Sequence, residues 1–467
     1  MKTVTDSFID ERTIEDTLNA AVAPDRRRVR EILAKASTLA GLDQAEVAAL
    51  MNVVDQELLG EVYSAARSVK ETIYGSRLVL FAPLYISSFC RNDCVYCSFR
   101  ARNRELKRRA LTQEEIAAET LALVTQGHKR VLVVAGESYP EGTGLQYILD
   151  SIATVYNTRS GNGEIRRVNV NIAPLTVDDF GRLKAANIGT YQLFQETYHR
   201  DTYAKVHLAG VKRDYNWRVT GMHRAMQAGI DDVGIGVLLG LYNWKFEMLA
   251  MMQHIASLEQ EFGCGPHTVS VPRLEPAEGA PFATSSEWLT SDEDFLKAIA
   301  ILRLAVPYTG LILSTRESAE TRRRCFELGI SQISAGSRTD PGGYTAAETN
   351  GDLKGQFHLG DHRSLNEVIR DISELGFMPS FCTACYRLGR TGRDFMDMAK
   401  PGEIKYHCEP NALSTFQEYL DDYASPDSRT AGEQFVNIKL AQMEPPQRRI
   451  SEALLGEVKT GKRDVFV

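Results

Sequence analysis

Three cysteines follow the apolar run 78–86 in a C-x3-C-x2-C spacing: Cys90, Cys94 and Cys97. Thiolates packed this closely on one loop suit a soft metal or an iron–sulfur cluster. A cluster normally takes four protein ligands, so three cysteines leave one iron free to bind something else. An open coordination position is typical of a reactive metal site. The alternative is a zinc site completed by a distant His or Cys.

A second set of three cysteines lies far along the chain in a C-x2-C-x22-C spacing: Cys382, Cys385 and Cys408. It is again one ligand short of a full cluster, and a zinc site that uses His407 is the alternative. The remaining two cysteines, Cys264 and Cys325, stand alone in the sequence. We expect them to be small buried apolar residues, not ligands.

The composition narrows the function class. The chain has 467 residues and a net charge of −7, from 54 basic and 61 acidic residues, which argues against general nucleic-acid binding. No segment resembles a signal peptide or reaches membrane-spanning length, so we expect a cytoplasmic protein with no membrane association. In a reducing compartment the eight cysteines point to metal binding before disulfides.

Hydrophobic periodicity divides the chain into three regions. Residues 1–77 have helical spacing throughout and predict a helical N-terminal layer. Residues 78–345 alternate eight short apolar runs with capped helices, which predicts an α/β fold with a parallel sheet closed into a (β/α)8 TIM-type barrel. An open doubly wound sheet is the alternative. Residues 346–467 lack this alternation and predict an added helical domain that carries the second cysteine set.

The eight predicted strands are the runs 78–86, 131–135, 168–172, 190–194, 232–239, 268–272, 311–314 and 332–335. In such a barrel, chemistry takes place at the carboxyl ends of the strands. The first cysteine loop directly follows the first strand, so we expect it at that end.

The C-x3-C-x2-C spacing, with Tyr96 before the last cysteine, resembles the signature of radical S-adenosylmethionine (SAM) enzymes. The resemblance implies a 4Fe-4S cluster held by Cys90, Cys94 and Cys97, whose open iron is chelated by the methionine end of SAM. One electron from the cluster then cleaves SAM to a 5′-deoxyadenosyl radical, so the cofactor supplies the difficult chemistry and the barrel orients it.

Further stretches resemble the SAM-binding segments of that family. Ala135-Gly136-Glu137 is similar to a Gly-Gly-Glu segment that meets the SAM amino group, with Ala in place of the first Gly. The resemblance also implies a polar contact from Glu196, in the stretch 195–199. Two further contacts are implied, a carboxylate contact from Arg218 and a close backbone approach to adenine at Gly236. Alone, a buried strand glycine more often marks tight packing.

Both cysteine sets, with the stretches 82–87, 265–268, 313–317 and 382–387, make the chain similar to the radical SAM tyrosine lyases that mature FeFe-hydrogenase. The related tyrosine lyases of thiazole biosynthesis share the barrel motifs but lack the C-terminal cysteines. The resemblance implies cleavage of the Cα–Cβ bond of L-tyrosine to p-cresol and dehydroglycine, which becomes carbon monoxide and cyanide.

The resemblance also assigns substrate-binding residues. Arg316 matches the residue for the tyrosine carboxylate, since a guanidinium suits bidentate carboxylate binding. A salt bridge to Glu317 or Glu320 is the alternative role of this arginine. Ser337, after the eighth strand, is expected to add a hydrogen bond to the substrate.

The second cysteine set would hold a second 4Fe-4S cluster with an additional iron, bound through a free L-cysteine ligand. His267 matches the family's ligand to that iron, although a lone His is more often a hydrogen-bonded structural residue. An iron dicarbonyl cyanide precursor would pass to other hydrogenase maturation proteins, and a ferredoxin or flavodoxin would supply electrons. Because the two clusters lie in different regions, we predict an internal channel through the barrel. A thiazole-pathway tyrosine lyase and a non-catalytic iron–sulfur carrier remain the alternatives.

Overall fold

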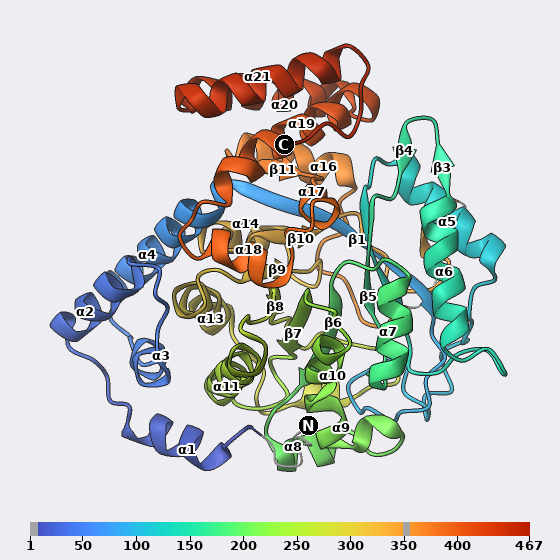
Figure 1. Ribbon diagram of the computed structural model, residues 1–467. Helices are drawn as coiled ribbons and strands as arrows, with labels where there is room; N and C mark the ends of the chain where they lie inside the picture. Colours follow the sequence, from blue (N-terminus) through green and yellow to red (C-terminus); the bar gives the residue numbers. More distant parts are fainter. Residues whose placement is uncertain (1–7, 349–354) are drawn as a thin grey trace.

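A closed barrel of eight parallel strands forms the centre of the computed structural model, which describes residues 8–348 and 355–467 (Figure 1). Each strand pairs with the next along the chain, and the last, β10, pairs with the first, β1. The predicted barrel is therefore confirmed, and the open sheet is excluded. The strands are β1 (Arg77–Ser87), β2 (Arg130–Ala135), β5 (Arg167–Asn171), β6 (Tyr191–Glu196), β7 (Val233–Val237), β8 (Thr268–Ser270), β9 (Gly310–Leu313) and β10 (Gln332–Ser334).

Helices between the strands form the outer layer. Two of these helices begin with the N-caps that the sequence indicates. The side chains of Thr112 and Ser291 accept hydrogen bonds from the backbone N–H of the third residue of the following helix. The helices are α5 (Gln113–Thr125), α6 (Leu145–Asn157), α7 (Val177–Ala185), α8 (Arg200–Val206), α9 (Tyr215–Val219), α10 (Gly221–Gln227), α11 (Trp244–Phe262), α12 (Phe282–Ser285), α13 (Asp292–Ala305), α14 (Ala319–Glu327) and α15 (Gly343–Glu348). A short hairpin, β3 (Arg159–Ser160) and β4 (Gly163–Glu164), precedes β5.

The N-terminal helices cover one side of the barrel, over α11 and α13 (Figure 1). They are α1 (Glu11–Ala20), α2 (Arg26–Ala36), α3 (Gln44–Met51) and α4 (Gln56–Tyr74). The basic residues at the start of α2 are exposed, and Arg26 and Arg30 pair with carboxylates of and before α4. This agrees with a solvated helix face.

A ninth parallel strand, β11 (Met378–Ser380), pairs with β1 in addition to the two barrel neighbours of β1, and it was not predicted. It pairs with Arg77–Val79, so it lies at the amino end of β1. Its length of three residues and its central Pro379 hide it in the sequence, because proline is confined to strand edges and ends. β11 follows α16 (Leu365–Glu374) and leads directly to Cys382.

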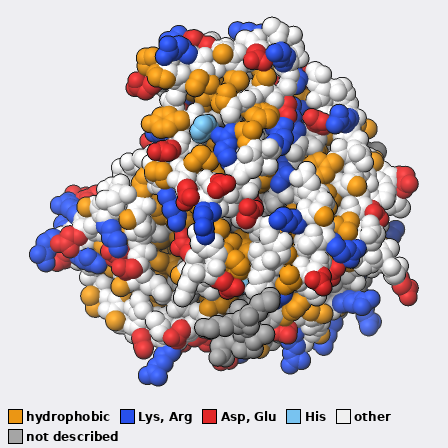
Figure 2. All heavy atoms as spheres, viewed as in Figure 1, with side chains coloured by type: hydrophobic (Ala, Val, Ile, Leu, Met, Phe, Trp, Pro, Cys, Tyr) orange, Lys and Arg blue, Asp and Glu red, His pale blue; other side chains and the backbone are white. Residues whose placement is uncertain are grey.

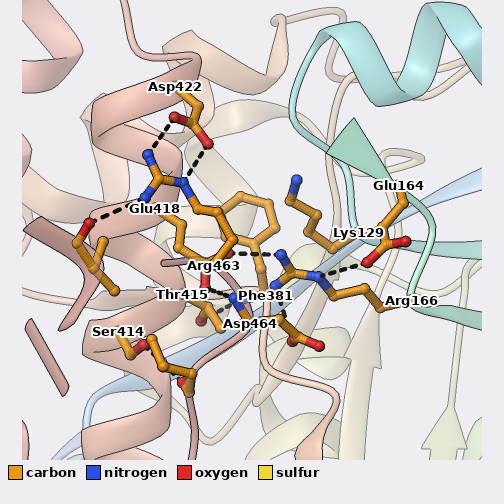
Figure 3. Close-up of polar contacts among 12 residues, drawn as sticks. Lys129, Glu164, Arg166, Phe381, Ser414, Thr415, Glu418, Asp422, Arg463 and Asp464 are labelled. Atoms are coloured by element: carbon orange, nitrogen blue, oxygen red, sulfur yellow. Dashed lines mark hydrogen bonds and ion pairs between the residues drawn. The ribbon is translucent and has the colours of Figure 1, made fainter. Parts of the chain in front are cut away.

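The rest of the C-terminal region is helical, as predicted, and lies at one side of the barrel in Figure 1. A buried ion-pair network joins it to the barrel (Figure 3): Arg166, just before β5, contacts Glu418 at 2.8 Å and Asp464 at 3.1 Å. Arg463 pairs with Asp422 at 2.6 Å. The helices are α17 (Ala384–Arg387), α18 (Gly392–Ala399), α19 (Lys405–Asp422), α20 (Pro426–Gln442) and α21 (Pro445–Lys459).

Acidic and basic side chains are intermixed over the face of the molecule seen in Figure 2. Among the helices of residues 8–348 and 355–467, none is both long and apolar enough to cross a membrane. Cys264 and Cys325 are buried in the main hydrophobic core, which confirms the packing role predicted for them.

Candidate active site

The first cysteine set lies on the loop after β1, at the carboxyl end of the barrel. Arg108 shapes this loop by donating hydrogen bonds to the carbonyls of Cys90 at 3.3 Å and Phe99 at 3.2 Å. Asp93, fully buried beside the cysteines, accepts from Arg100 at 2.7 Å. These contacts fix the backbone on both sides of the three cysteines.

Gly136 lets the next loop pack directly on the cysteine loop. A Cβ atom at this position would lie 2.2 Å from the Phe89 carbonyl oxygen and 3.4 Å from the Cβ of Cys90. The Gly136 N–H donates to the carbonyl of Ser87 at 2.9 Å. The segment predicted to meet SAM therefore touches the cysteine loop, and Ala135 is buried at the end of β2.

The three thiols are largely buried and close enough to influence one another's ionisation. Burial raises the pKa of Cys94 and Cys90, and burial together with the Cys90 thiol raises the pKa of Cys97 to about 11. Such thiols stay protonated until a metal replaces the proton. Three convergent cysteines with no disulfide fit the ligand set of a site-differentiated iron–sulfur cluster.

Two buried ion pairs lie beside the cysteines. Glu137 accepts from Arg218 at 2.7 Å and from Asn92 at 2.7 Å. Glu196 accepts from Lys212 at 2.6 Å, and Arg218 lies 3.6 Å from the same Glu196 oxygen. The two predicted SAM-contact carboxylates and the predicted SAM-contact arginine are thus one network. Sequence reasoning missed Lys212, which lies in a short 3-10 helix (Val211–Arg213).

Electrostatics keep this network charged although it is buried. Burial raises the pKa of Glu137, but Arg218 and Lys212 together hold it below the ordinary value. Burial and Arg218 oppose the charge on Lys212, whereas Glu196 and the Cys94 thiol raise its pKa above the ordinary value. A cation beside three prospective thiolates stabilises their deprotonated form.

Glu196 has a backbone φ of 73°, which is unusual for a residue other than glycine. The strand register shifts between Phe194 and Glu196 at the same point. Strain of this kind persists where neighbouring contacts fix it and is concentrated at functional sites. The bulge turns the Glu196 side chain toward Lys212.

A cavity of about 160 Å³ opens beside the cysteine loop, inside the barrel. It is lined by Tyr96, Cys97, Glu196 and Arg218 among the predicted site residues, and also by Arg316. The Tyr96 hydroxyl hydrogen-bonds to His207 Nε2 at 2.8 Å. A larger open groove between α4, α16, α19 and α20 contains none of the predicted site residues.

Arg316 is partly buried on the wall of this cavity with its guanidinium over the Phe357 ring, 3.3 Å from the centroid. Glu317 pairs with Arg273, so the alternative salt bridge between Arg316 and Glu317 is not formed. Within the described residues no carboxylate lies at ion-pair distance from Arg316, and burial lowers its pKa. Arg316 donates one hydrogen bond, to the Arg273 carbonyl at 3.5 Å, and a partly buried guanidinium without a carboxylate partner that faces a cavity suits a carboxylate ligand.

Gln356 and Phe357 enter the first site from beyond the predicted domain boundary at 345/346. Gln356 accepts from the Tyr85 hydroxyl at 2.8 Å, and its amide lies 3.6 Å from the Cys97 sulfur. These residues were missed, because nothing in their local sequence indicates a contact with residues about 260 positions earlier. The boundary itself stays a prediction.

The structure gives less support to two other predicted ligand contacts, those of Ser337 with the substrate and of Gly236 with adenine. Ser337 is buried and its hydroxyl has no hydrogen-bond partner among the described residues, but it does not line the cavity. Gly236 packs against the Phe194 ring and the Ser270 carbonyl, where a Cβ atom would lie 2.8 and 2.4 Å away. Packing alone therefore requires this glycine, and its role toward adenine stays a prediction.

The second cysteine set surrounds another cavity, of about 50 Å³, at the opposite end of the barrel. Cys382 follows β11, Cys385 lies in α17 and Cys408 lies in α19. The same cavity is lined by Arg77 and Val79 of β1, whereas Phe81, Pro83 and Tyr85 of that strand line the first cavity. Alternate residues of a strand face the same side, so both cavities lie within one barrel interior.

The second cavity is strongly cationic, with Arg77, Arg130 and Arg390 in its wall. A hydrogen bond from Cys385, followed by Arg77 and Arg390, lowers the pKa of Cys408 below its ordinary value. The site therefore holds at least one thiol ready to ligate a metal. Arg130 also donates to the Cys382 carbonyl at 2.8 Å.

His267 lies on the wall of the second cavity, directly before β8 and against the Phe395 ring, 4.5 Å between centroids. Burial lowers its pKa, which keeps the imidazole in the neutral form that metals bind. His407, the ligand of the zinc alternative, is exposed and outside this cavity. Within residues 8–348 and 355–467, no three His, Cys, Asp or Glu residues form a group that could hold a single metal ion.

Comparison with known proteins agrees with this geometry. Residues 84–255 match the model of the radical SAM superfamily, and residues 270–378 match the biotin and thiamin synthesis associated domain. The chain is 31% identical over 396 residues to 2-iminoacetate synthase of Escherichia coli (strain K12), covering 84% of this chain and 100% of that protein. This chain belongs to the radical SAM family that contains 2-iminoacetate synthase.

Two solved members of this radical SAM family are similar over nearly the whole chain. A crystal structure of HydG, described as a maturase of the FeFe-hydrogenase, has a TM-score of 0.94 and 47% identity, covering 98% of this chain and 100% of that one. HydG from Carboxydothermus hydrogenoformans has a TM-score of 0.84 and 41% identity, covering 96% and 97%. Membership of the radical SAM family makes the chain an enzyme that uses a 4Fe-4S cluster and SAM.

Proposed function

We propose that this enzyme cleaves the Cα–Cβ bond of L-tyrosine to p-cresol and dehydroglycine, and then forms carbon monoxide and cyanide on an additional iron at the second cysteine set. The observation that carries the proposal is the placement of two three-cysteine sets at opposite ends of one barrel interior. The E. coli relative is named 2-iminoacetate synthase, and two similar structures are named FeFe-hydrogenase maturases.

The first cavity supplies charges for both ligands of the cleavage step. The 4Fe-4S cluster and SAM supply radical chemistry when bound. Glu137 and Glu196 are the carboxylates for the SAM amine, and Arg218 and Lys212 are the cations for its carboxylate. Arg316 binds the tyrosine carboxylate, and the Phe357 ring packs against the guanidinium and limits its orientation. Together p-cresol and dehydroglycine contain all the atoms of tyrosine.

The fragment passes along the barrel interior to the second cavity. The lining of the first cavity includes polar side chains of four strands: Asn171, Gln192, Ser270 and Ser334. Gln332, two residues before Ser334, lines the second cavity. This polar lining suits the small, polar dehydroglycine fragment, which breaks down to carbon monoxide, cyanide as HCN, and water with all atoms conserved.

At the second cavity, Cys382, Cys385 and Cys408 hold the second cluster. His267 binds the additional iron with a free L-cysteine. The three arginines of the wall attract anions, cyanide among them. The product, an iron dicarbonyl cyanide species, leaves for a maturation partner, and a ferredoxin or flavodoxin delivers electrons.

Anaerobic turnover with SAM, dithionite and L-tyrosine tests the proposal. We expect p-cresol, and carbon monoxide and cyanide in amounts that depend on the second cysteine set. Formation of p-cresol without carbon monoxide or cyanide would instead support the thiazole-pathway lyase. Absence of p-cresol from protein with full iron and sulfide content would support the iron–sulfur carrier.

A further inference from the structure

A buried carboxylate, that of Asp232, lies in the second cavity beside His267. Asp232 directly precedes β7, is 3% exposed and lines the cavity with the three cysteines and His267. Neither of its side-chain oxygens has a hydrogen-bond partner among the described residues. The described residues also offer no partner to His267 Nδ1, which lies 3.9 Å from Asp232 Oδ2.

These two unsatisfied groups fit each other. Burying a carboxylate without a hydrogen bond is costly, and the same holds for an imidazole N–H. A separation of 3.9 Å exceeds a hydrogen bond, but a small rotation of the imidazole or one bridging water closes it. Packing of the His267 ring on Phe395 limits the other orientations that it can take.

No arginine of the described cavity wall occupies the Asp232 carboxylate, so it can accept a hydrogen bond from His267. Arg77, Arg130 and Arg390 face the same cavity, but in the described chain none of them lies at ion-pair distance from Asp232. Metal-bound histidines almost always donate their second ring N–H to a carboxylate, a carbonyl or water, which fixes the tautomer and makes the ligand more basic.

We propose that Asp232 is a positioning residue that accepts a hydrogen bond from Nδ1–H of His267 and thereby directs the Nε2 lone pair to the additional iron. The inference rests on the proposed function of the second cysteine set. It adds a residue that the sequence motifs do not indicate, because Asp232 lies 35 positions before His267 and belongs to no cysteine segment.

The test is a titration of cluster-reconstituted full-length protein with ferrous iron, measuring iron bound beyond the two clusters and its electron paramagnetic resonance signal. Asp232→Ala should weaken binding of the additional iron about 10- to 100-fold. Asp232→Asn, which keeps a neutral acceptor, should weaken it less. Cluster iron, sulfide and p-cresol formation should stay unchanged in both variants.

Asp231→Asn is the matched control, since it removes the neighbouring carboxylate, which is exposed and outside the cavity. This variant should bind the additional iron as the parent does. Unchanged iron affinity in Asp232→Ala would overturn the inference. An equal loss in Asp231→Asn would also overturn it, because it would indicate a general charge effect.

A double variant separates positioning from direct binding. In the His267→Ala background, Asp232→Ala should cause no further loss of iron, because its effect passes through the imidazole. A further loss there would overturn the positioning role. Failure of the wider proposal has a different signature, namely no p-cresol from the parent enzyme, and it leaves the iron titration interpretable.

Discussion

The two cysteine sets each supply three thiols, but different parts of the fold bring the thiols together. The first set lies on one loop of eight residues, held by local contacts such as those of Arg108 and Asp93. The second set comes from three elements, β11, α17 and α19, brought together by the fold. A site on one loop can be found from its spacing, whereas an assembled site depends on tertiary packing.

The charges around the two sets differ in the same way. Near the first set two cations are matched by carboxylates, Lys212 by Glu196 and Arg218 by Glu137. Around the second set the wall carries three arginines, with Asp232 as a buried carboxylate among them. A balanced site suits a zwitterionic amino-acid ligand, whereas a cationic site suits thiolates and small anions.

Removing one cysteine from each set should have opposite consequences, and this is the largest effect that we expect. Cys94→Ala should abolish SAM cleavage and p-cresol formation, because the first cluster loses one of three ligands. Cys385→Ala should keep p-cresol formation but reduce carbon monoxide and abolish hydrogenase activation. Iron content, p-cresol and carbon monoxide are measured on both variants. Hydrogenase activation by Cys385→Ala would contradict the role of the second set.

Gly136→Ala should damage the first set alone. Its Cβ atom would meet the Phe89 carbonyl at 2.2 Å, so the cysteine loop must move. We expect loss of most of the first cluster, measured as iron and sulfide, with the second cluster retained. Gly181→Ala is the control: it lies in α7 with no atom within 4 Å of the new Cβ and should stabilise the helix by about 0.5–1 kcal/mol. Full cluster content in Gly136→Ala would show that the loop tolerates the shift.

Arg316→Gln should affect tyrosine and leave SAM binding intact. Losing a charge-assisted hydrogen bond to a carboxylate costs about 1.5–3 kcal/mol, roughly a 10- to 150-fold increase in KM for tyrosine. Steady-state p-cresol formation at varied tyrosine and SAM concentrations measures this. Arg324→Gln, an exposed arginine in α14, is the control and should leave KM unchanged. A change confined to the SAM dependence would reassign Arg316.

The contrast between the sets also explains what the sequence could predict. The eight barrel strands were found because each is a short apolar run followed by a capped helix. The first cysteine set was found from its spacing, whereas its neighbours Glu137, Glu196 and Arg218 were indicated by a resemblance to the SAM-binding segments of radical SAM enzymes. His267 was also found, from a resemblance to a family and not from its spacing.

Contacts between distant segments were missed. Gln356 reaches Cys97 across 259 positions, and Arg166 reaches Glu418 across 252. β11 is too short to show a period, and Cys382 comes two residues after it. The sequence could not decide whether His407 is a zinc ligand of the second set, since only the fold shows that His407 is exposed.

The smallest effect should come from weakening the ion pairs of Asp464, which lie next to the helix that carries Cys385. Asp464 pairs with Arg166 at 3.1 Å (Figure 3). It also pairs with Arg387 of α17, the helix that carries Cys385. Asp464→Asn weakens both pairs, and since the side chain is a quarter exposed we expect a local cost of about 1 kcal/mol. Amide hydrogen exchange in α17 should then be roughly fivefold faster.

The matched control is Glu452→Gln, which breaks an exposed pair with Arg448 within α21. An exposed pair of this kind contributes about 0.3–0.5 kcal/mol, so exchange in α17 should not change. Exchange around the first cysteine set should be unaffected by either variant, because that loop is held by its own contacts. Faster exchange in the first loop on Asp464→Asn would mean that the two ends of the barrel are coupled, and that the distinction between a local and an assembled site is too sharp.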